Sequence, residues 1–312
     1  MGTFNRRTVL QGGAALCLAA GLPALAAERR PPLSFLAIGD WGRQGARDQT
    51  AVAAAMADAA HEVDSRFVLS VGDNFYPGGV QSVTDPNWKR SFEDVYSAAS
   101  LQTPWFAALG NHDYRGKPKA QIAYSAISPR WRMPSRHYRV PSQALPPDLD
   151  IFVLDTTPMT EDVGEAIMRL SWGRVSMPDP RRQLAWLDEQ LARSTAPWKV
   201  VVGHHPIRSG GRHGGSPMLA QALEPLLERH GVQAYVCGHD HALQHVQIGA
   251  THHICSGAGA SAGPVTSVRG TRFAASRPGF AVFTLDDGGL RIGFRGAAGE
   301  TLYEASLAGR RA

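Results

Sequence analysis

The feature that most constrains this chain is a design that occurs five times: a short apolar run, then glycine, then a side chain that can bind a metal ion. The five segments are SFLAIGD ending at Asp40, FVLSVGDNFY with Asp73 and Tyr76, WFAALGNH with Asn111 and His112, VVVGHH with His204 and His205, and AYVCGHDH with His239 and His241. A short apolar run closed by glycine predicts a buried strand and its exit turn. Because ligands of open α/β sheets bind outside the carboxyl ends of the strands, we expect these side chains to meet in one cleft. A glycine at each exit permits a positive φ and a close approach of the backbone.

The pattern around these segments predicts one mixed α/β domain. We expect a further buried strand at 151–156, and helices over 48–61, 88–99, 181–193 and 216–230. Later apolar runs alternate with turns and predict hairpins, at 243–248, 252–256, 280–285 and 290–295. Residues 115–148 indicate an irregular connection with one short helix. Residues 157–180 show no clean period, and we interpret them as a surface lid.

Composition indicates a globular chain and narrows the function. With 312 residues, of which 43% are hydrophobic, the chain can bury a sizeable core. Lys and Arg number 32 against 27 Asp and Glu, a net charge of +5, which falls to +3 without Arg6 and Arg7. So small an excess gives no reason to expect nucleic-acid binding. The three cysteines, Cys17, Cys237 and Cys255, supply neither a disulfide framework nor a CxxC metal site.

Residues 1–27 have the features of a targeting signal. Arg6 and Arg7 precede an uncharged stretch rich in Ala, Leu and Gly that contains an A-x-A cleavage pattern. The paired arginines resemble a twin-arginine signal, so we expect the twin-arginine export machinery to be a partner. The mature protein, residues 28–312, is then a single catalytic domain in the periplasm or outside a bacterial cell. The alternative is an uncleaved membrane anchor, but glycines and a proline dilute the apolar stretch that a spanning helix needs.

The polar side chains at the strand ends carry the chemistry. A single histidine is more often a surface or satisfied core residue than a ligand, but His239 and His241, at i and i+2 on one strand end, point the same way. Burying them beside carboxylates without a cation would cost several kcal/mol. The candidate ligands are Asp40, Asp73, Tyr76, Asn111, His204, His239 and His241. Seven exceed what one tetrahedral zinc takes, so we infer two metal ions bridged by one carboxylate.

The blocks GDWG, GDNFY, GNHD, GHHP and GHDH, in this order, resemble the five blocks of the calcineurin-like metallophosphoesterases. Tyr76 narrows the resemblance to the purple acid phosphatases, and the chain length resembles their small, tartrate-resistant type. The similarity continues through AQIAYS, RWRMPSRHYRV, RRQLAWLDEQLA, GVQAYVCGHDHALQH and SGAG, and covers about residues 33–265. It implies a four-layer α/β/β/α sandwich in which helices flank two mixed sheets.

The resemblance also implies which residues hold which metal. An Fe(III) ion falls on Asp40, Asp73, Tyr76 and His241. A divalent Fe, Zn or Mn ion falls on Asp73, Asn111, His204 and His239, so that Asp73 bridges the two ions. Phenolate and carboxylate oxygens suit a hard trivalent ion, whereas imidazole and amide groups suit a borderline divalent one.

Two departures from the family pattern concern the loop around His213. Animal members of the family have Glu where this chain has Arg212, and they carry a loop disulfide for which this chain has no cysteines. This chain therefore lacks the glutamate that could act as an acidic proton donor at this position. Arg212 offers instead a guanidinium that can bind phosphate.

The function we expect is hydrolysis of small phosphate monoesters at acid pH by metal-activated hydroxide. His112 is expected to hydrogen-bond the phosphoryl group, and His213 to contact phosphate or protonate the leaving group. His205 either lines the pocket or packs beside His204. The alternatives are phosphodiesterase or nucleotidase activity, a non-catalytic metal- or phosphate-binding protein, and redox chemistry at an iron pair. No stable insertion into a membrane is expected.

Overall fold

The computed structural model describes residues 1–2, 31–160 and 178–307. The unit from Pro31 onward contains two mixed sheets of seven strands each. Residues 3–30, and with them most of the expected targeting signal, lie outside the described part. Most of the expected lid, 161–177, also lies outside it.

The first sheet joins the amino-terminal strands to the last strands of the chain. Its order is β14-β13-β12-β1-β2-β3-β4. The strands are β1 (Leu33–Ile38), β2 (Ser65–Ser70), β3 (Trp105–Ala107), β4 (Trp131–Arg132), β12 (Gly279–Asp286), β13 (Gly289–Gly296) and β14 (Thr301–Ser306). Strands β1 to β4 run parallel, whereas β12 pairs with β1 in the antiparallel sense and continues into β13 and β14. The sheet is therefore mixed, with its parallel half built first along the chain.

The second sheet has the order β11-β9-β10-β8-β7-β6-β5. Its strands are β5 (Tyr138–Arg139), β6 (Leu149–Val153), β7 (Trp198–Val202), β8 (Ala234–Cys237), β9 (Leu243–Ile248), β10 (Thr251–Ser256) and β11 (Thr271–Ala275). Strands β6, β7, β8 and β10 are mutually parallel, and the pairs at both ends are antiparallel. Cys237 and Cys255 lie buried on neighbouring strands as free thiols.

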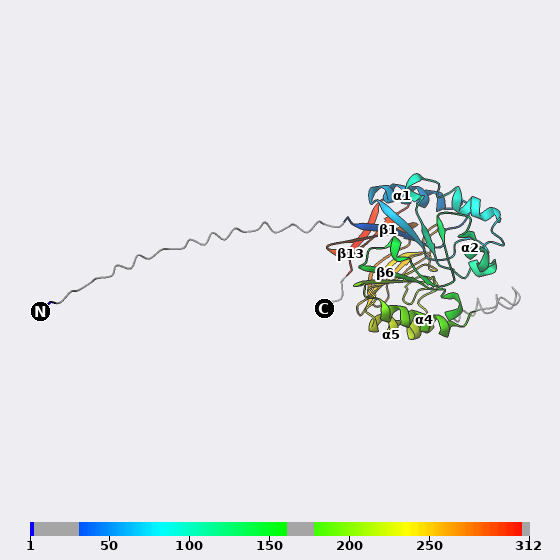
Figure 1. Ribbon diagram of the computed structural model, residues 1–312. Helices are drawn as coiled ribbons and strands as arrows, with labels where there is room; N and C mark the ends of the chain where they lie inside the picture. The colour runs from blue at the N-terminus through cyan, green and yellow to red at the C-terminus, as the bar shows by residue number, and fades with distance from the viewer. Residues whose placement is uncertain (3–30, 161–177, 308–312) are drawn as a thin grey trace. The chain divides into compact units, whose positions relative to one another are not determined.

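Helices cover the outer face of each sheet. Figure 1 shows α1 (Gln49–Glu62) over the sheet that contains β1, and α4 (Pro180–Arg193) and α5 (Pro217–Arg229) together beneath the sheet that contains β6. One apolar core fills the space between the sheets and under α1, and a second lies between the α4/α5 pair and its sheet. This order confirms the four-layer α/β/β/α sandwich. Within the described ranges no helix combines the length and the apolarity that crossing a bilayer requires.

Local sequence explains where α4 and α5 begin. Asp179 caps α4 by accepting a hydrogen bond from the Arg181 backbone N–H, and Ser216 caps α5 by accepting one from Leu219 N–H. In each helix a proline follows the cap, at the first helical position, where its missing N–H costs nothing. Leucines spaced four residues apart in α5, at 219, 223 and 227, then bury one face against the sheet.

The predicted elements match these bounds with three differences. The helix expected over 88–99 is wrong: the chain forms a π-helical segment, Trp88–Glu93, followed by turns and a short 3-10 segment, Ala99–Leu101. Its aromatic residues pack at irregular angles around Trp131 and Trp105 rather than along one helical face. Strands β11 and β14 lie at sheet edges and are partly exposed, so neither gave a clean apolar run. The irregular stretch 115–148 contains the expected short helix, α2 (Pro118–Tyr124), but also the two-residue strands β4 and β5.

Candidate metal centre

Five parallel strands from both sheets end at one place. Strands β1, β2 and β3 are neighbours in the first sheet, and β7 and β8 are neighbours in the second. Asp40, Asp73, Asn111, His204 and His239 follow these strands in that order. All five side chains are buried, with 8% exposure or less. The side chains expected to meet at the strand ends therefore come from both sheets.

The backbone at the strand ends explains why small residues precede the polar ones. Of the exit glycines, which permit a positive φ, Gly72 alone adopts one. Asp40, Asp73 and His239 themselves adopt φ values of 62°, 51° and 67°. Such left-handed residues concentrate at functional sites, where surrounding contacts hold them in place. Gly238 is required for close approach, since a Cβ there would lie 2.4 Å from an Asp40 carboxylate oxygen.

The first group of donors surrounds the Tyr76 hydroxyl. This hydroxyl lies 2.9 Å from Asp40 Oδ1 and 2.7 Å from Asp73 Oδ2, and 3.2 Å from His241 Nε2. His241 Nε2 is itself 3.5 Å from Asp40 Oδ1. Three side chains from three separate strand ends thus converge on one phenol oxygen.

The second group surrounds the Asn111 side-chain oxygen. His204 Nε2 lies 3.1 Å from Asn111 Oδ1, and His239 Nδ1 lies 3.2 Å from the same oxygen. His204 Nε2 is also 3.4 Å from Asp73 Oδ1. Asp73 therefore contacts the first group through Oδ2 and the second through Oδ1.

Burial and neighbouring charge set the protonation of these groups. Burial alone would raise the pKa of Asp73, but His204, His112 and the Tyr76 hydroxyl hold it well below its ordinary value. Burial lowers the pKa of His204, but Asp73 and Asp40 raise it to about 10. Burial and the histidines around it hold the pKa of His239 well below the ordinary value.

The phenol behaves differently from the histidines. Burial, together with Asp40 and Asp73, raises the pKa of Tyr76 well above its ordinary value. Without a cation, the hydroxyl therefore keeps its proton and donates it to the carboxylates. A metal ion at this oxygen would replace the proton, because it satisfies the same carboxylates with greater charge.

The donor set fits two metal ions. Ligand atoms of Asp40, Asp73 and His204 lie within 4.8 Å of one another, and so do those of His204, His205 and His239. Buried carboxylates and imidazoles at such distances are retained in proteins when a cation or a proton compensates them. The first group is rich in oxygen and suits a hard ion, while the second is rich in imidazole and suits a borderline one.

His112 lies at the edge of the first group. Its backbone N–H donates to Asp73 Oδ1 at 2.8 Å, and its ring centroid is 4.3 Å from that of Tyr76. Its Nδ1 is 2.8 Å from the Pro77 carbonyl oxygen, which only accepts hydrogen bonds, so Nδ1 carries a proton. Nε2 is the remaining ring nitrogen and lies 3.9 Å from Asp73 Oδ2.

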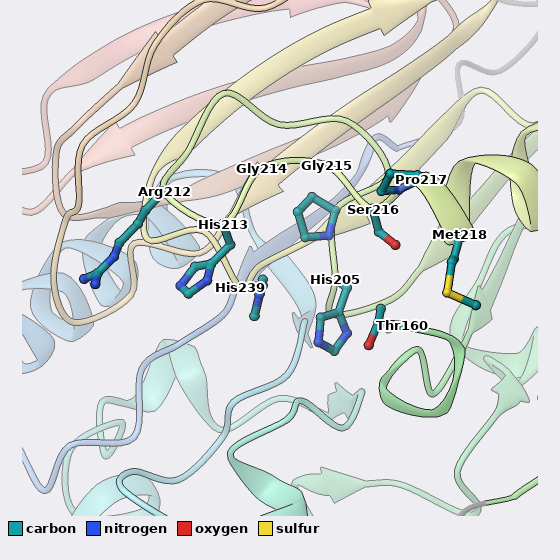
Figure 2. Close-up of a pocket in the computed structure, with 11 residues that line it drawn as sticks. Thr160, His205, Arg212, His213, Gly214, Gly215, Ser216, Pro217, Met218 and His239 are labelled. Carbon is teal, nitrogen blue, oxygen red and sulfur yellow. The ribbon is translucent and has the colours of Figure 1, made fainter. Parts of the chain in front are cut away.

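His205 and His213 border a cavity beside the second group. Figure 2 shows both rings next to His239, at one wall of this cavity. The His213 ring lies 4.4 Å from the His239 ring, and the His205 ring lies 4.5 Å from it. His205 Nδ1 is 2.9 Å from Thr156 Oγ1. His205 thus both lines the pocket and packs beside His204, at a ring separation of 4.9 Å.

Sequence reasoning missed the residues that hold the Asp73 turn. Asn74 is fully buried, and its side-chain amide donates to the Ala108 carbonyl at 2.8 Å and to Gln121 Oε1 at 2.9 Å. Asp113 accepts hydrogen bonds from the backbone N–H groups of Asn74 and Gly110. Burial and Asp73 raise the pKa of Asp113 to about 7. Both residues stand inside the GDNFY and GNHD blocks, which was the signal available for finding them.

Arg43 is a second residue that the sequence analysis did not single out. Its guanidinium carbon lies 3.6 Å from the centroid of the Tyr76 ring, so the cation covers the ring face. Its Nε is buried and has no hydrogen-bond partner among the described residues. A cation in this position stabilises negative charge on the ring.

Comparison with known proteins agrees with this geometry. The profile of the calcineurin-like phosphoesterase family matches residues 33–243. Human tartrate-resistant acid phosphatase type 5 is 39% identical over 250 residues, which are 76% of each chain. Purple acid phosphatase 7 of Arabidopsis thaliana is 41% identical over 238 residues, 74% of this chain and 71% of that one. The chain therefore belongs to the calcineurin-like phosphoesterases.

The relatives narrow the family further. At 36–41% identity over most of the chain, they place it among the purple acid phosphatases of the tartrate-resistant type. Among solved structures, GAP50, described as the anchor in the inner membrane complex of Plasmodium, superposes with a TM-score of 0.77 at 26% identity and covers 90% of both chains. The purple acid phosphatase PPD1 of yellow lupin superposes with a TM-score of 0.64 at 16% identity, over 88% of this chain and 53% of that one, and so supports the fold alone.

Proposed function

We propose that this protein is a metal-dependent acid phosphatase that hydrolyses small phosphate monoesters. The observation that carries the proposal is the division of the buried donors into two groups that share Asp73, one oxygen contacting each group. A bridging carboxylate with donors on both sides is what a two-metal hydrolase requires. Membership of the purple acid phosphatases supports the same activity.

The ligands of each metal follow from the two groups. Asp40, Asp73, Tyr76 and His241 would hold Fe(III), and Asp73, Asn111, His204 and His239 would hold a divalent Fe, Zn or Mn ion. Bound there, the two ions would supply Lewis acidity that lowers the pKa of water and offsets the charge of the phosphoryl group. The chain supplies a rigid, buried frame that fixes the donors before substrate arrives.

His112 and His213 are the residues proposed to act on substrate. Because Nδ1 of His112 donates to the Pro77 carbonyl, Nε2 is the ring nitrogen left for a phosphoryl oxygen, and it donates a proton there when the ring is protonated as the imidazolium. Burial lowers the pKa of His112, so this form belongs to acid pH. His213 is exposed and lies against His239, where it can reach the oxygen of the leaving group. Its backbone N–H donates to Asp240 Oδ1 at 2.7 Å, which fixes the backbone from which the ring extends.

Measured turnover of a phosphate monoester and of a diester distinguishes the proposed phosphatase from a phosphodiesterase and from a non-catalytic binding protein. Purified protein loaded with iron and a divalent metal is expected to hydrolyse p-nitrophenyl phosphate faster than bis(p-nitrophenyl) phosphate at acid pH. The reverse order would make the protein a phosphodiesterase. No turnover of any monoester, with both metals found by elemental analysis, would leave a non-catalytic binding protein. GAP50, which is described as an anchor, shares this fold.

We further propose that the protein is exported by the twin-arginine route. The support is Arg6-Arg7 before an uncharged stretch with an A-x-A pattern. Replacing both arginines by lysine is expected to leave the protein in the cytoplasm, as measured by cell fractionation. Amino-terminal sequencing of periplasmic wild-type protein is expected to start near Ala27, and finding Met1 or Gly2 there would contradict cleavage.

A further inference from the structure

A cavity of about 650 Å³ opens beside the candidate metal centre. His239 and His205 form part of its lining, so it is continuous with the second group of donors. A volume of this size is typical of a small-molecule site and far exceeds what a phosphoryl group fills. The cavity therefore has room for the organic part of a substrate whose phosphate lies at the metals.

The lining of this cavity is polarised along its length. Figure 2 shows Arg212 at one end and Met218 at the other, with His213, His239 and His205 between them. Met218 is 40% exposed and offers apolar surface. None of the described residues that line the cavity is acidic. Its charge therefore favours a negatively charged occupant over a neutral one.

Arg212 is the cation of this cavity. Its side chain is exposed, and across the ranges that the structure describes no carboxylate lies within 4.0 Å of it. The nearby Arg208 differs, because it makes two hydrogen bonds of 2.7 Å to Glu224 on α5 and does not line the cavity. None of the five N–H donors of Arg212 is therefore taken by a carboxylate of a described residue, so they can serve a ligand.

The loop that carries Arg212 is fixed on both sides. The Ser209 hydroxyl donates to Asp240, and the Gly210 N–H donates to Gln244 Oε1 at 2.8 Å. Gly211 forms a bridge with Val265. The N–H of His213 is held by Asp240 on the other side of Arg212. These contacts hold the backbone of Arg212 in position next to His213, whose ring contacts His239.

We propose that this cavity selects phosphate monoesters that carry a second anionic group, and that Arg212 binds this group. The proposal rests on the proposed phosphatase activity and adds the substrate class. The phosphoryl group lies at the metals, the organic part extends along the lining past His213, and a carboxylate or a second phosphate pairs with the Arg212 guanidinium. Arginine suits this role because its planar fork bonds both oxygens of such a group.

Matched substrates test the proposal. Phenyl phosphates that bear a para chain of one to four carbons ending in a carboxylate are compared with the isosteric carboxamides, so that leaving group and size are constant. The measured quantity is the ratio of kcat/KM for carboxylate over carboxamide at each chain length. In wild-type protein this ratio is expected to reach about fivefold at the best length, the scale of a partly exposed ion pair. The ratio is expected to fall as salt is raised.

Variants assign the preference to one side chain. Arg212→Gln is expected to bring the ratio close to one, Arg212→Lys to retain part of the preference, and Arg212→Glu to reverse it. Arg208→Gln removes a nearby positive charge that is paired outside the cavity, and is expected to leave the ratio as in the wild type.

Two results would overturn the proposal in different ways. Equal ratios in wild type and Arg212→Gln at every chain length, with both substrates hydrolysed, would refute the anion subsite and leave the phosphatase function intact. Hydrolysis of neither substrate by metal-loaded wild type would refute the proposed function itself, and the subsite with it.

Discussion

Asp73 lies at the centre of the candidate site because its two carboxylate oxygens contact different groups of donors. Its turn is fixed by the backbone N–H of His112, by the Tyr76 hydroxyl and, through Asn74, by Asp113. His204, and after it His112 and the Tyr76 hydroxyl, hold the pKa of Asp73 well below its ordinary value and so keep the carboxylate ionised in spite of its burial. The ionised form is the one that can balance two cations.

Asp73→Asn is therefore expected to lose most activity and at least one metal ion, because a neutral amide cannot balance two cations. His112→Ala is expected to retain both metals and to lose about 10²-fold in kcat, the scale of one lost transition-state contact. Elemental analysis and kinetics of the two variants make the comparison. Loss of metal from His112→Ala would show that His112 is a ligand rather than a group that acts on substrate.

Tyr76 gives a prediction that does not depend on activity. A phenolate bound to Fe(III) absorbs visible light by charge transfer, so the oxidised, iron-loaded protein is expected to be pink to purple and Tyr76→Phe to be colourless. Arg43→Gln is expected to shift the band to lower energy, since the cation 3.6 Å from the ring centroid stabilises the phenolate from which the electron leaves. The measurement is a visible spectrum at equal iron content. A colourless wild type would remove Tyr76 from the ligands.

At the scale of elements, α5 contributes its first residues, Pro217 and Met218, to the lining of the cavity. Leu219, Leu223 and Leu227 form its buried face against the second sheet, and its amino terminus follows the loop that carries Arg212. The free energy that holds this helix comes mainly from apolar burial, since an isolated helix of 13 residues is marginal in water.

Leu223→Ala is expected to reduce the free energy of unfolding by about 2–5 kcal/mol, because the side chain is fully buried and its removal leaves a cavity. Leu226→Ala, on the partly buried side of the same helix, is the matched control and is expected to cost less. Chemical denaturation of both variants gives the comparison. Equal losses would mean that α5 does not depend on this face.

At the scale of the whole unit, a buried pair of histidines connects the two sheets. His245 Nε2 on β9 lies 2.8 Å from His252 Nδ1 on β10, and His245 Nδ1 lies 3.1 Å from the Tyr303 hydroxyl on β14 of the other sheet. Burial, with neighbouring histidines and Arg272, lowers the pKa of His245 to about 4, and burial with Arg272 does the same for His252. Both rings are therefore neutral in the folded protein at neutral pH.

This pair predicts how stability depends on pH. A histidine with a pKa of about 4 when folded and about 6.5 when unfolded binds protons more readily in the unfolded chain. The contribution of such a histidine to the free energy of unfolding is fully present above pH 6.5, and it is lost as the pH decreases toward 4. Urea unfolding of metal-free protein across this range measures the free energy of unfolding at each pH. Its slope against pH is expected to be smaller for His252→Gln than for wild type. The exposed His61→Gln is the control, and equal slopes in wild type and His252→Gln would contradict the prediction.

Much of the fold and of the donor set could be predicted because both follow local rules. Apolar runs closed by glycine gave the strands of the parallel halves, and leucine spacing gave α4 and α5. The prediction of a helix at 88–99 was wrong because the apolar residues there pack into an aromatic core instead of along one helical face. In this core Trp88 stacks on Tyr124, which belongs to a distant segment. Strands β11 and β14 were missed because edge strands carry a weak pattern.

The sequence by itself determined which kinds of side chain end the five strands, because a short apolar run, glycine and a polar residue form a local pattern. Only the tertiary structure decided how those side chains are shared: Oδ2 of Asp73 faces Tyr76, and Oδ1 faces His204. It also decided that Arg43 covers the Tyr76 ring and that Arg212 borders a cavity. Such relations join residues that are far apart in the chain, so they depend on how the two sheets pack and on no local pattern.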